Sequence, residues 1–159
     1  MHSKILTTLF IATTAILAPA QSITTTFVSN NGGSTGWGNF FDIKVLKKMT
    51  ITRMDVNAST ASVPFTCDIW LTPTTYVGKD LNQAAWVKIS TGAGTATVRN
   101  TPSPVDIEDF TLSPGSYGIA VYYNGTGMAY TNGTGSNQSY KNQDIELTLG
   151  VARTALFGG

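Results

Sequence analysis

The sequence is poor in the residues that carry most enzyme chemistry. Its 159 residues include one histidine, His2, and one cysteine, Cys67. Beyond His2 there is no imidazole for a Ser/His/Asp or Cys/His nucleophile, a histidine general base or a histidine metal ligand. A lone cysteine also excludes an intramolecular disulfide, so packing has to supply the stability.

Residues 1–20 have the pattern of an export signal. His2 and Lys4 precede an apolar run, and residues 18–20 are Ala-Pro-Ala, small residues of the kind that a signal peptidase recognises. A retained membrane anchor is the weaker alternative, because the run falls short of the roughly 20 apolar residues that a span needs. We therefore expect residues 1–20, His2 included, to be removed, leaving residues 21–159 as one secreted or surface-located domain without a membrane span.

Charge of either sign is scarce as well. Charged residues make up 12% of the chain, and without Lys4 the 10 basic residues become 9 (10 − 1), which equals the 9 acidic ones. The longest basic run is Lys47-Lys48. Such a chain has no electrostatic footprint for phosphate backbones or for an anionic membrane surface, so nucleic acid is not an expected partner.

What the sequence does contain is a succession of short, alternating or β-branched stretches with no sustained helical period. The expected strands are residues 23–28, 39–46, 49–56, 65–71, 86–90, 94–99, 105–112, 117–123, 128–131 and 144–149. Residues 29–38 and 133–142 are expected loops. Eight to ten such strands predict an all-β fold, a two-layer antiparallel β-sandwich that is jelly-roll-like or immunoglobulin-like.

Several local patterns give finer predictions. The apolar parity slips between Ile51 and Met54, which predicts a bulge. Residues 92–94, Gly-Ala-Gly, suggest a turn, with Val87, Ile89, Ala96 and Val98 facing inward on its two sides. Cys67 shares the parity of Phe65, Ile69 and Leu71, which predicts a buried and inert thiol.

The stretch from Asp109 to Asn124 is the clearest strand pair. Pro114 and Gly115 predict a type II turn over residues 113–116, which would place Leu112 opposite Tyr117 and Phe110 opposite Ile119. The alternatives are a turn that carries a bulge and a passage from one layer to the other. The second face of the later strand, Gly118, Ala120 and Tyr122, is small enough to admit another layer or a ligand.

The acidic residues offer two candidate chemistries. Glu108 and Glu146 are the only glutamates, and a glycosidase would need a carboxylate pair. Asp106, Glu108 and Asp109 could instead hold a hard cation through oxygen ligands, with Asp80 and Asn82 a weaker candidate. A solvated strand face is favoured for the three, because the spacing of a calcium loop is absent. No cofactor is expected, since residues 29–38 also lack a nucleotide-binding pattern.

Aromatic residues offer a third chemistry. Trp70 lies on the polar parity of its strand, so it is either covered by a loop such as residues 76–86 or exposed as a flat platform. Trp70, Tyr122 and Tyr130 could together stack on sugar rings if the fold brings them to one surface. Packing inside the protein is the favoured interpretation.

The chain resembles a family of uncharacterised secreted bacterial β-sandwich modules over nearly the whole length after residue 20. The motifs that carry the resemblance, in order, are Gly38-Asn-Phe-Phe-Asp42, Tyr76-Val-Gly78, Ala84-Ala-Trp86, Leu112-Ser-Pro-Gly-Ser-Tyr117, Tyr130-Thr-Asn-Gly-Thr134 and Phe157-Gly-Gly159. The resemblance implies export and a non-catalytic module, and it assigns no catalytic residue. Members of the family continue beyond the Phe-Gly-Gly motif with another strand. Either this chain is a fragment or its last strand is absent, and an absent strand would leave an open sheet edge.

These observations give an order of expected functions. The first is a non-enzymatic structural, surface or adhesion module whose partners are extracellular glycans or surface proteins, with self-association through a strand edge. The second is a carbohydrate-binding module that uses exposed aromatic residues. A carboxylate-dependent hydrolase is the third.

Overall fold

The computed structural model describes residues 21–158, a range that leaves out the predicted export signal at residues 1–20. Regular structure in this range consists of ten strands and one short 3-10 helix, η1 (Gln83–Ala85). The strands are β1 (Asn31–Gly32), β2 (Gly38–Val45), β3 (Met49–Val56), β4 (Pro64–Pro73), β5 (Val87–Thr95), β6 (Ser103–Leu112), β7 (Gly115–Asn124), β8 (Ala129–Tyr130), β9 (Ser139–Lys141) and β10 (Ile145–Arg153).

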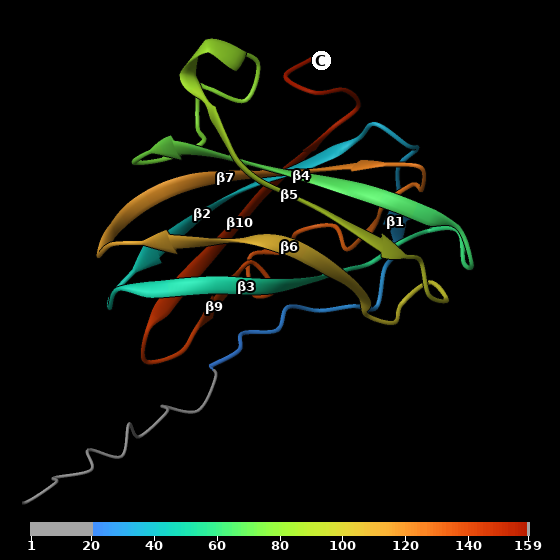
Figure 1. Ribbon diagram of the computed structural model, residues 1–159, viewed down its shortest axis with the longest axis horizontal. Coiled ribbons are helices and arrows are strands. Elements are labelled where there is room, and N and C mark those ends of the chain that lie inside the picture. The colour runs from blue at the N-terminus through green and yellow to red at the C-terminus, as the bar shows by residue number, and fades with distance from the viewer. Residues whose placement is uncertain (1–20, 159) are drawn as a thin grey trace, which may run out of the picture.

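Eight of the strands form one antiparallel sheet in the order β3-β6-β5-β4-β7-β2-β10-β9, while β1 pairs with β8. Figure 1 shows the large sheet curling so that β7, β4 and β5 lie over β6 and β3. The predicted all-β, two-layer antiparallel fold is confirmed. Its two layers are parts of one curled sheet.

The main core fills the space between the layers with the inward-facing side chains of the strands. Ile119, Val121 and Tyr123 of β7 are buried there, as the alternation predicts. Cys67 and Ile69 of β4 lie beside them with no exposed surface, so the prediction of a buried thiol is confirmed. Burial of these apolar side chains is the main favourable contribution to folding.

The irregularity predicted at the parity slip in β3 is also confirmed. The pairing with β6 shifts register between Ile51 and Arg53, where β3 advances by two residues and β6 by four, so the extra residues lie on β6. The shift lets the apolar parity change within both strands. This irregularity and the charged residues after it make β3 a poor template for pairing at the free edge of the sheet.

The predicted turn at residues 92–94 is wrong. These residues lie inside β5, which continues without a break to Thr95. Gly92 is needed for a different reason: a Cβ there would lie 2.5 Å from the carbonyl oxygen of Asp106 in β6. β5 pairs with β6 at this point, through Gly92 with Ile107 and Ala93 with Asp106.

The inward placement of two valines flanking this segment is wrong as well. Val87 is 66% exposed and Val98 is 67% exposed. Ile89 packs partly against the main core and Ala96 is buried, as expected. The pairing of β5 with β4 shifts register between Ser90 and Lys88, so the parity of Val87 differs from that of the later residues of β5. Val98 lies beyond the end of β5 at Thr95, where the strand alternation no longer applies.

The hairpin predicted between residues 109 and 124 does not form. β6 pairs with β3 and β5, whereas β7 pairs with β2 and β4, so two strands lie between them in the sheet. Leu112 is paired with Met49 rather than with Tyr117. The segment through Pro114 therefore passes from one layer to the other, which was one of the alternative interpretations.

The first predicted strand, residues 23–28, is not a strand. Its burial alternates with period two, with Ile23 and Phe27 half-buried, but its hydrogen bonds go to side chains. The Tyr140 hydroxyl contacts the backbone and side chain of Thr26, and Asn57 donates to the Phe27 carbonyl at 2.7 Å. The segment crosses beneath β9 and β3 (Figure 1), so it lies at the opening between the two edges of the sheet.

Candidate functional site

Six aromatic side chains gather on the outer face of β2, β4 and β7, and we call them the aromatic cluster. They are Phe40, Trp70, Tyr76, Trp86, Tyr122 and Phe157. Gly118 and Ala120 on the same face of β7 leave room for this second layer. The sequence predicted that another layer or a ligand could lie against this face. Aromatic side chains of the same chain fill that space.

Phe157 occupies the centre of the aromatic cluster. Its ring lies 5.3–6.0 Å from four other rings, edge to face with Phe40 and Trp70 and tilted against Trp86 and Tyr122. Such tilted arrangements are the favoured ones for aromatic pairs. Phe157 belongs to the C-terminal segment, residues 154–158, which follows β10 and folds back over the sheet.

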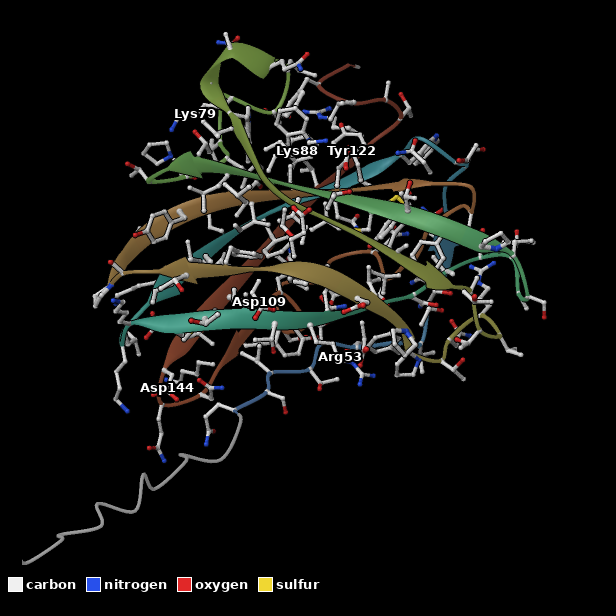
Figure 2. All side chains as sticks on the ribbon, viewed as in Figure 1. Arg53, Lys79, Lys88, Asp109, Tyr122 and Asp144 are labelled. Atoms are coloured by element: carbon white, nitrogen blue, oxygen red, sulfur yellow. The ribbon has the colours of Figure 1, made fainter. Side chains whose placement is uncertain are left out.

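The Tyr122 hydroxyl fixes this C-terminal segment in place. It donates to the Ala155 carbonyl at 2.6 Å and accepts from the Phe157 amide at 2.8 Å. Figure 2 shows Tyr122 on the side of the sheet where the C-terminal segment lies. Burial raises the pKa of Tyr122 to about 12, so the hydroxyl is neutral and can both donate and accept at physiological pH.

The other cover of the aromatic cluster is a loop, residues 74–86, which we call the covering loop. Asp42 of β2 accepts hydrogen bonds from the Thr75 hydroxyl at 2.6 Å and from the Tyr76 amide at 2.8 Å. Asp80 forms an ion pair with Arg153 of β10, whose Nε lies 2.7 Å from Oδ2 of Asp80. Two carboxylates thus tie the covering loop to the sheet, at its start and near its middle.

The three residues predicted to stack on sugars do not form one exposed surface. Trp70 and Tyr122 both belong to the aromatic cluster, where Tyr122 is 2% exposed. Tyr130 lies in β8 and packs partly against the main core instead. The covering loop and Phe157 occupy the faces that a sugar ring would need.

The predicted cation ligands lie on β6, in the lower layer of Figure 1. Asp106 and Glu108 are exposed and line an open hollow of about 400 Å³ together with Thr66, Thr91 and Gly92. Asp109 has the opposite parity, and Figure 2 shows it in the same lower layer as Arg53. Within residues 21–158 no three acidic, histidine or cysteine side chains are placed to hold a metal ion.

Most other carboxylates form ion pairs or hydrogen bonds with neighbouring side chains, which gives them a structural role. Glu146 lies 3.4 Å from Lys44, and Asp144 lies 2.7 Å from Lys47. Glu146 is on β10 and Glu108 on β6, which are not neighbours in the sheet. The two glutamates therefore come from separate parts of the sheet.

Burial, followed by the nearby Asp68 carboxylate, raises the pKa of the Cys67 thiol to about 12. The thiolate is the reactive form of cysteine, and at neutral pH almost none is present at such a pKa. Cys67 is thus a packed apolar side chain of β4.

A second hollow lies at one end of the sheet, where three loops meet, and we call it the three-loop pocket. Its volume is about 370 Å³ and its lining residues are Gly33, Ser34, Thr35, Ser59, Thr60, Gly125, Thr126 and Gly127. Main-chain hydrogen bonds join the loops: Gly33 N donates to Met128 O at 2.8 Å, and Ser59 N donates to Gly127 O at 2.9 Å. The walls are therefore held in fixed relative positions.

Sequence reasoning did not find the three-loop pocket, because its residues come from three short segments that are far apart in the chain. Serine, threonine and glycine are also the ordinary residues of turns. No local pattern distinguishes a loop that lines a pocket from one that merely connects strands.

A scan against models of known protein families gives no match, and a search of curated proteins likewise finds no significant similarity. In the part of the chain that the structure describes, no helix has the length and apolar character needed to cross a membrane.

Proposed function

We propose that this chain is a non-catalytic, exported module that serves as a structural or adhesive component of the cell surface. The observation that supports this assignment is that most of its carboxylates bind other groups of the protein and so stabilise the fold. The carboxylates held by a cation or by hydrogen-bond donors are Asp42, Asp55, Asp68, Asp80, Asp144 and Glu146.

Two further features support the same function. The aromatic cluster is closed by the covering loop and the C-terminal segment, so its rings serve packing. The resemblance to secreted bacterial β-sandwich modules and the signal pattern of residues 1–20 support export. An exported domain without disulfides gains durability from such ties, because they hold its loops against local opening.

The test is to locate the protein and define its first residue. We expect the chain to be recovered outside the cytoplasm with Gln21 as its N-terminus, and to be cleaved by protease added to intact cells. A cytoplasmic protein that still begins at Met1 would contradict export. Turnover of glycan, peptide or ester substrates by the purified chain would contradict a non-catalytic role.

Carbohydrate binding is the second candidate function, and the three-loop pocket favours it. The lining residues are uncharged and carry hydroxyl groups, which is suited to sugar hydroxyls. A glycan array with the protein and a Trp70→Ala variant separates the two possible surfaces. Binding that is lost in the variant would assign it to the aromatic cluster, and binding that persists would assign it elsewhere.

A further inference from the structure

The three-loop pocket is a built site rather than a gap between mobile loops. The Gly36 amide donates to the Tyr123 carbonyl at 2.7 Å, and the Gly125 amide donates to the Thr35 hydroxyl at 2.9 Å. Together with the hydrogen bonds of Gly33 and Ser59 described above, these contacts connect each of the three lining loops to a neighbouring loop. A site of this kind loses little conformational entropy when a ligand binds.

Thr126 is the one lining residue of this pocket with a buried side chain, and its hydroxyl makes only long hydrogen bonds. Its side chain is 2% exposed, and its hydroxyl is 3.5 Å from the Thr60 carbonyl and 3.3 Å from the Gly127 carbonyl. Hydroxyl hydrogen bonds are usually about 2.7–2.8 Å long, so both contacts are weak. A buried hydroxyl with such poor contacts on the wall of a pocket is well placed to bond a ligand.

The chemistry of the walls restricts the ligand. None of the lining residues is charged or aromatic, and all those with a side chain carry a hydroxyl: Ser34, Thr35, Ser59, Thr60 and Thr126. A hydroxyl can donate one hydrogen bond and accept two, which matches the hydroxyls of a polyol. A charged ligand would lose its hydration without gaining an opposite charge.

We propose that the three-loop pocket binds a neutral, polyhydroxylated ligand, namely one sugar unit of a glycan. The hollow of about 370 Å³ is open to solvent, so it suits one partly exposed sugar unit rather than an enclosed ligand. Hydrogen bonds without aromatic stacking give weak binding, with a dissociation constant on the order of 1 mM for a single unit. This inference rests on the proposed adhesive function and gives it a site.

Amide chemical-shift mapping tests the pocket directly. The isotope-labelled chain, residues 21–159, is titrated with neutral mono- and disaccharides of glucose, galactose, mannose and N-acetylglucosamine, and with glucuronic acid as a charged counterpart. We expect at least one neutral sugar to shift the amides of residues 33–36, 59–60 and 125–127. Shifts confined to other regions, no shift up to about 50 mM sugar, or tighter binding of the charged sugar would overturn the proposal.

Two isosteric variants and one control locate the binding groups. Thr126→Val and Thr60→Val each remove one lining hydroxyl and should weaken binding about three- to tenfold. Thr126→Val should leave the unfolding midpoint nearly unchanged, because the bonds it removes are long. Thr148→Val, an exposed threonine on β10, is the matched control and should bind like the unchanged protein. Equal affinity in all three variants would overturn the proposal.

The outcome for the pocket can be distinguished from the outcome for the proposed function. Localisation, the N-terminal residue and adhesion of cells to the immobilised protein are measured without reference to the pocket. A surface-exposed adhesive protein whose loop amides do not respond to sugars would retain the function and lose the site. A cytoplasmic protein whose loop amides do respond would lose the function and retain the site.

Discussion

At the scale of single residues, Tyr122 contributes more than packing. Its ring belongs to the aromatic cluster, and its hydroxyl holds two backbone groups of the C-terminal segment. Removal of the hydroxyl would leave the Phe157 amide buried without a partner, and an unmet buried donor costs about 1–3 kcal/mol.

We therefore predict that Tyr122→Phe lowers the free energy of unfolding by about 1–3 kcal/mol. Urea denaturation followed by tryptophan fluorescence measures this, because Trp70 and Trp86 lie in the same cluster. Tyr117→Phe is the control: its hydroxyl donates to the Ser113 carbonyl at 3.0 Å in an exposed position, so its loss should cost less. Equal losses in the two variants would show that the Tyr122 hydroxyl does not fix the segment.

The same hydroxyl predicts an alkaline limit to stability. Burial raises the pKa of Tyr122 from 10.0 to about 12, so the unfolded chain releases this proton at lower pH than the folded chain. The stabilisation is fully present below pH 10 and is lost as the pH rises toward 12. Burial raises the pKa of Tyr123 as well, which adds to the same trend.

The measurement is the free energy of unfolding from neutral pH through this alkaline range, for the unchanged protein and for Tyr122→Phe. We expect the variant to lose less stability than the unchanged protein over that range, because Phe has no proton to release. Parallel curves would mean that Tyr122 makes no contribution to the alkaline transition.

At the scale of elements, the covering loop depends on the absence of a side chain at Gly118. A Cβ at this position of β7 would lie 2.5 Å from the Tyr76 amide nitrogen and 2.8 Å from the Thr75 carbonyl carbon. Both are backbone atoms of the loop, so the clash is relieved only by moving the loop away from the sheet. The hydrogen bonds that the same two residues donate to the Asp42 carboxylate would then stretch.

We predict that Gly118→Ala lowers the free energy of unfolding by about 1–3 kcal/mol, the usual cost of overpacking. Hydrogen exchange should show faster exchange of the covering-loop amides than in the unchanged protein. Ser116→Ala, two residues earlier on β7 and exposed, is the control and should leave both quantities nearly unchanged. Slow loop exchange in Gly118→Ala would contradict the close packing described here.

Strands were predictable where the pattern of apolar residues within the strand was sufficient to identify them. The alternation of Ile119, Val121 and Tyr123 identified a strand and its buried face. The neighbour of each strand was not predictable in the same way, because pairing joins residues that are distant in sequence. Gly92 illustrates this, because a glycine is common both in turns and where two strands approach closely. Here the nearby carbonyl of Asp106 on β6 shows that close approach of the strands is the reason for the glycine.

The candidate sites follow the same rule. The parity of Trp70 correctly allowed for a covering loop, but nothing near Trp70 in the sequence indicates that Phe157 would fill its face. The three-loop pocket has no local signal, since its hydroxyls meet only after β1, β3 and β7 have reached the same end of the sheet.

At the scale of the whole molecule, the curled sheet leaves an opening between its two edge strands, β3 and β9. Residues 21–30 lie at this opening and are held there by side-chain hydrogen bonds and by packing of Ile23 against the main core. The Asn142 side chain also donates to the Ser22 carbonyl at 3.2 Å. An edge strand without cover can pair with another molecule, so this segment limits self-association.

We predict that Ile23→Asp detaches the segment and favours self-association, because a carboxylate is not tolerated against the apolar core. The unfolding free energy should fall by about 1–3 kcal/mol, the contribution of one partly buried aliphatic side chain. Light scattering should show a larger mean mass that rises with protein concentration. Thr24→Asp adds the same charge at the adjacent, outward position and should remain as monomeric as the unchanged protein. If both variants associate equally, added charge rather than exposure of the edges is the cause, and the segment does not protect the sheet.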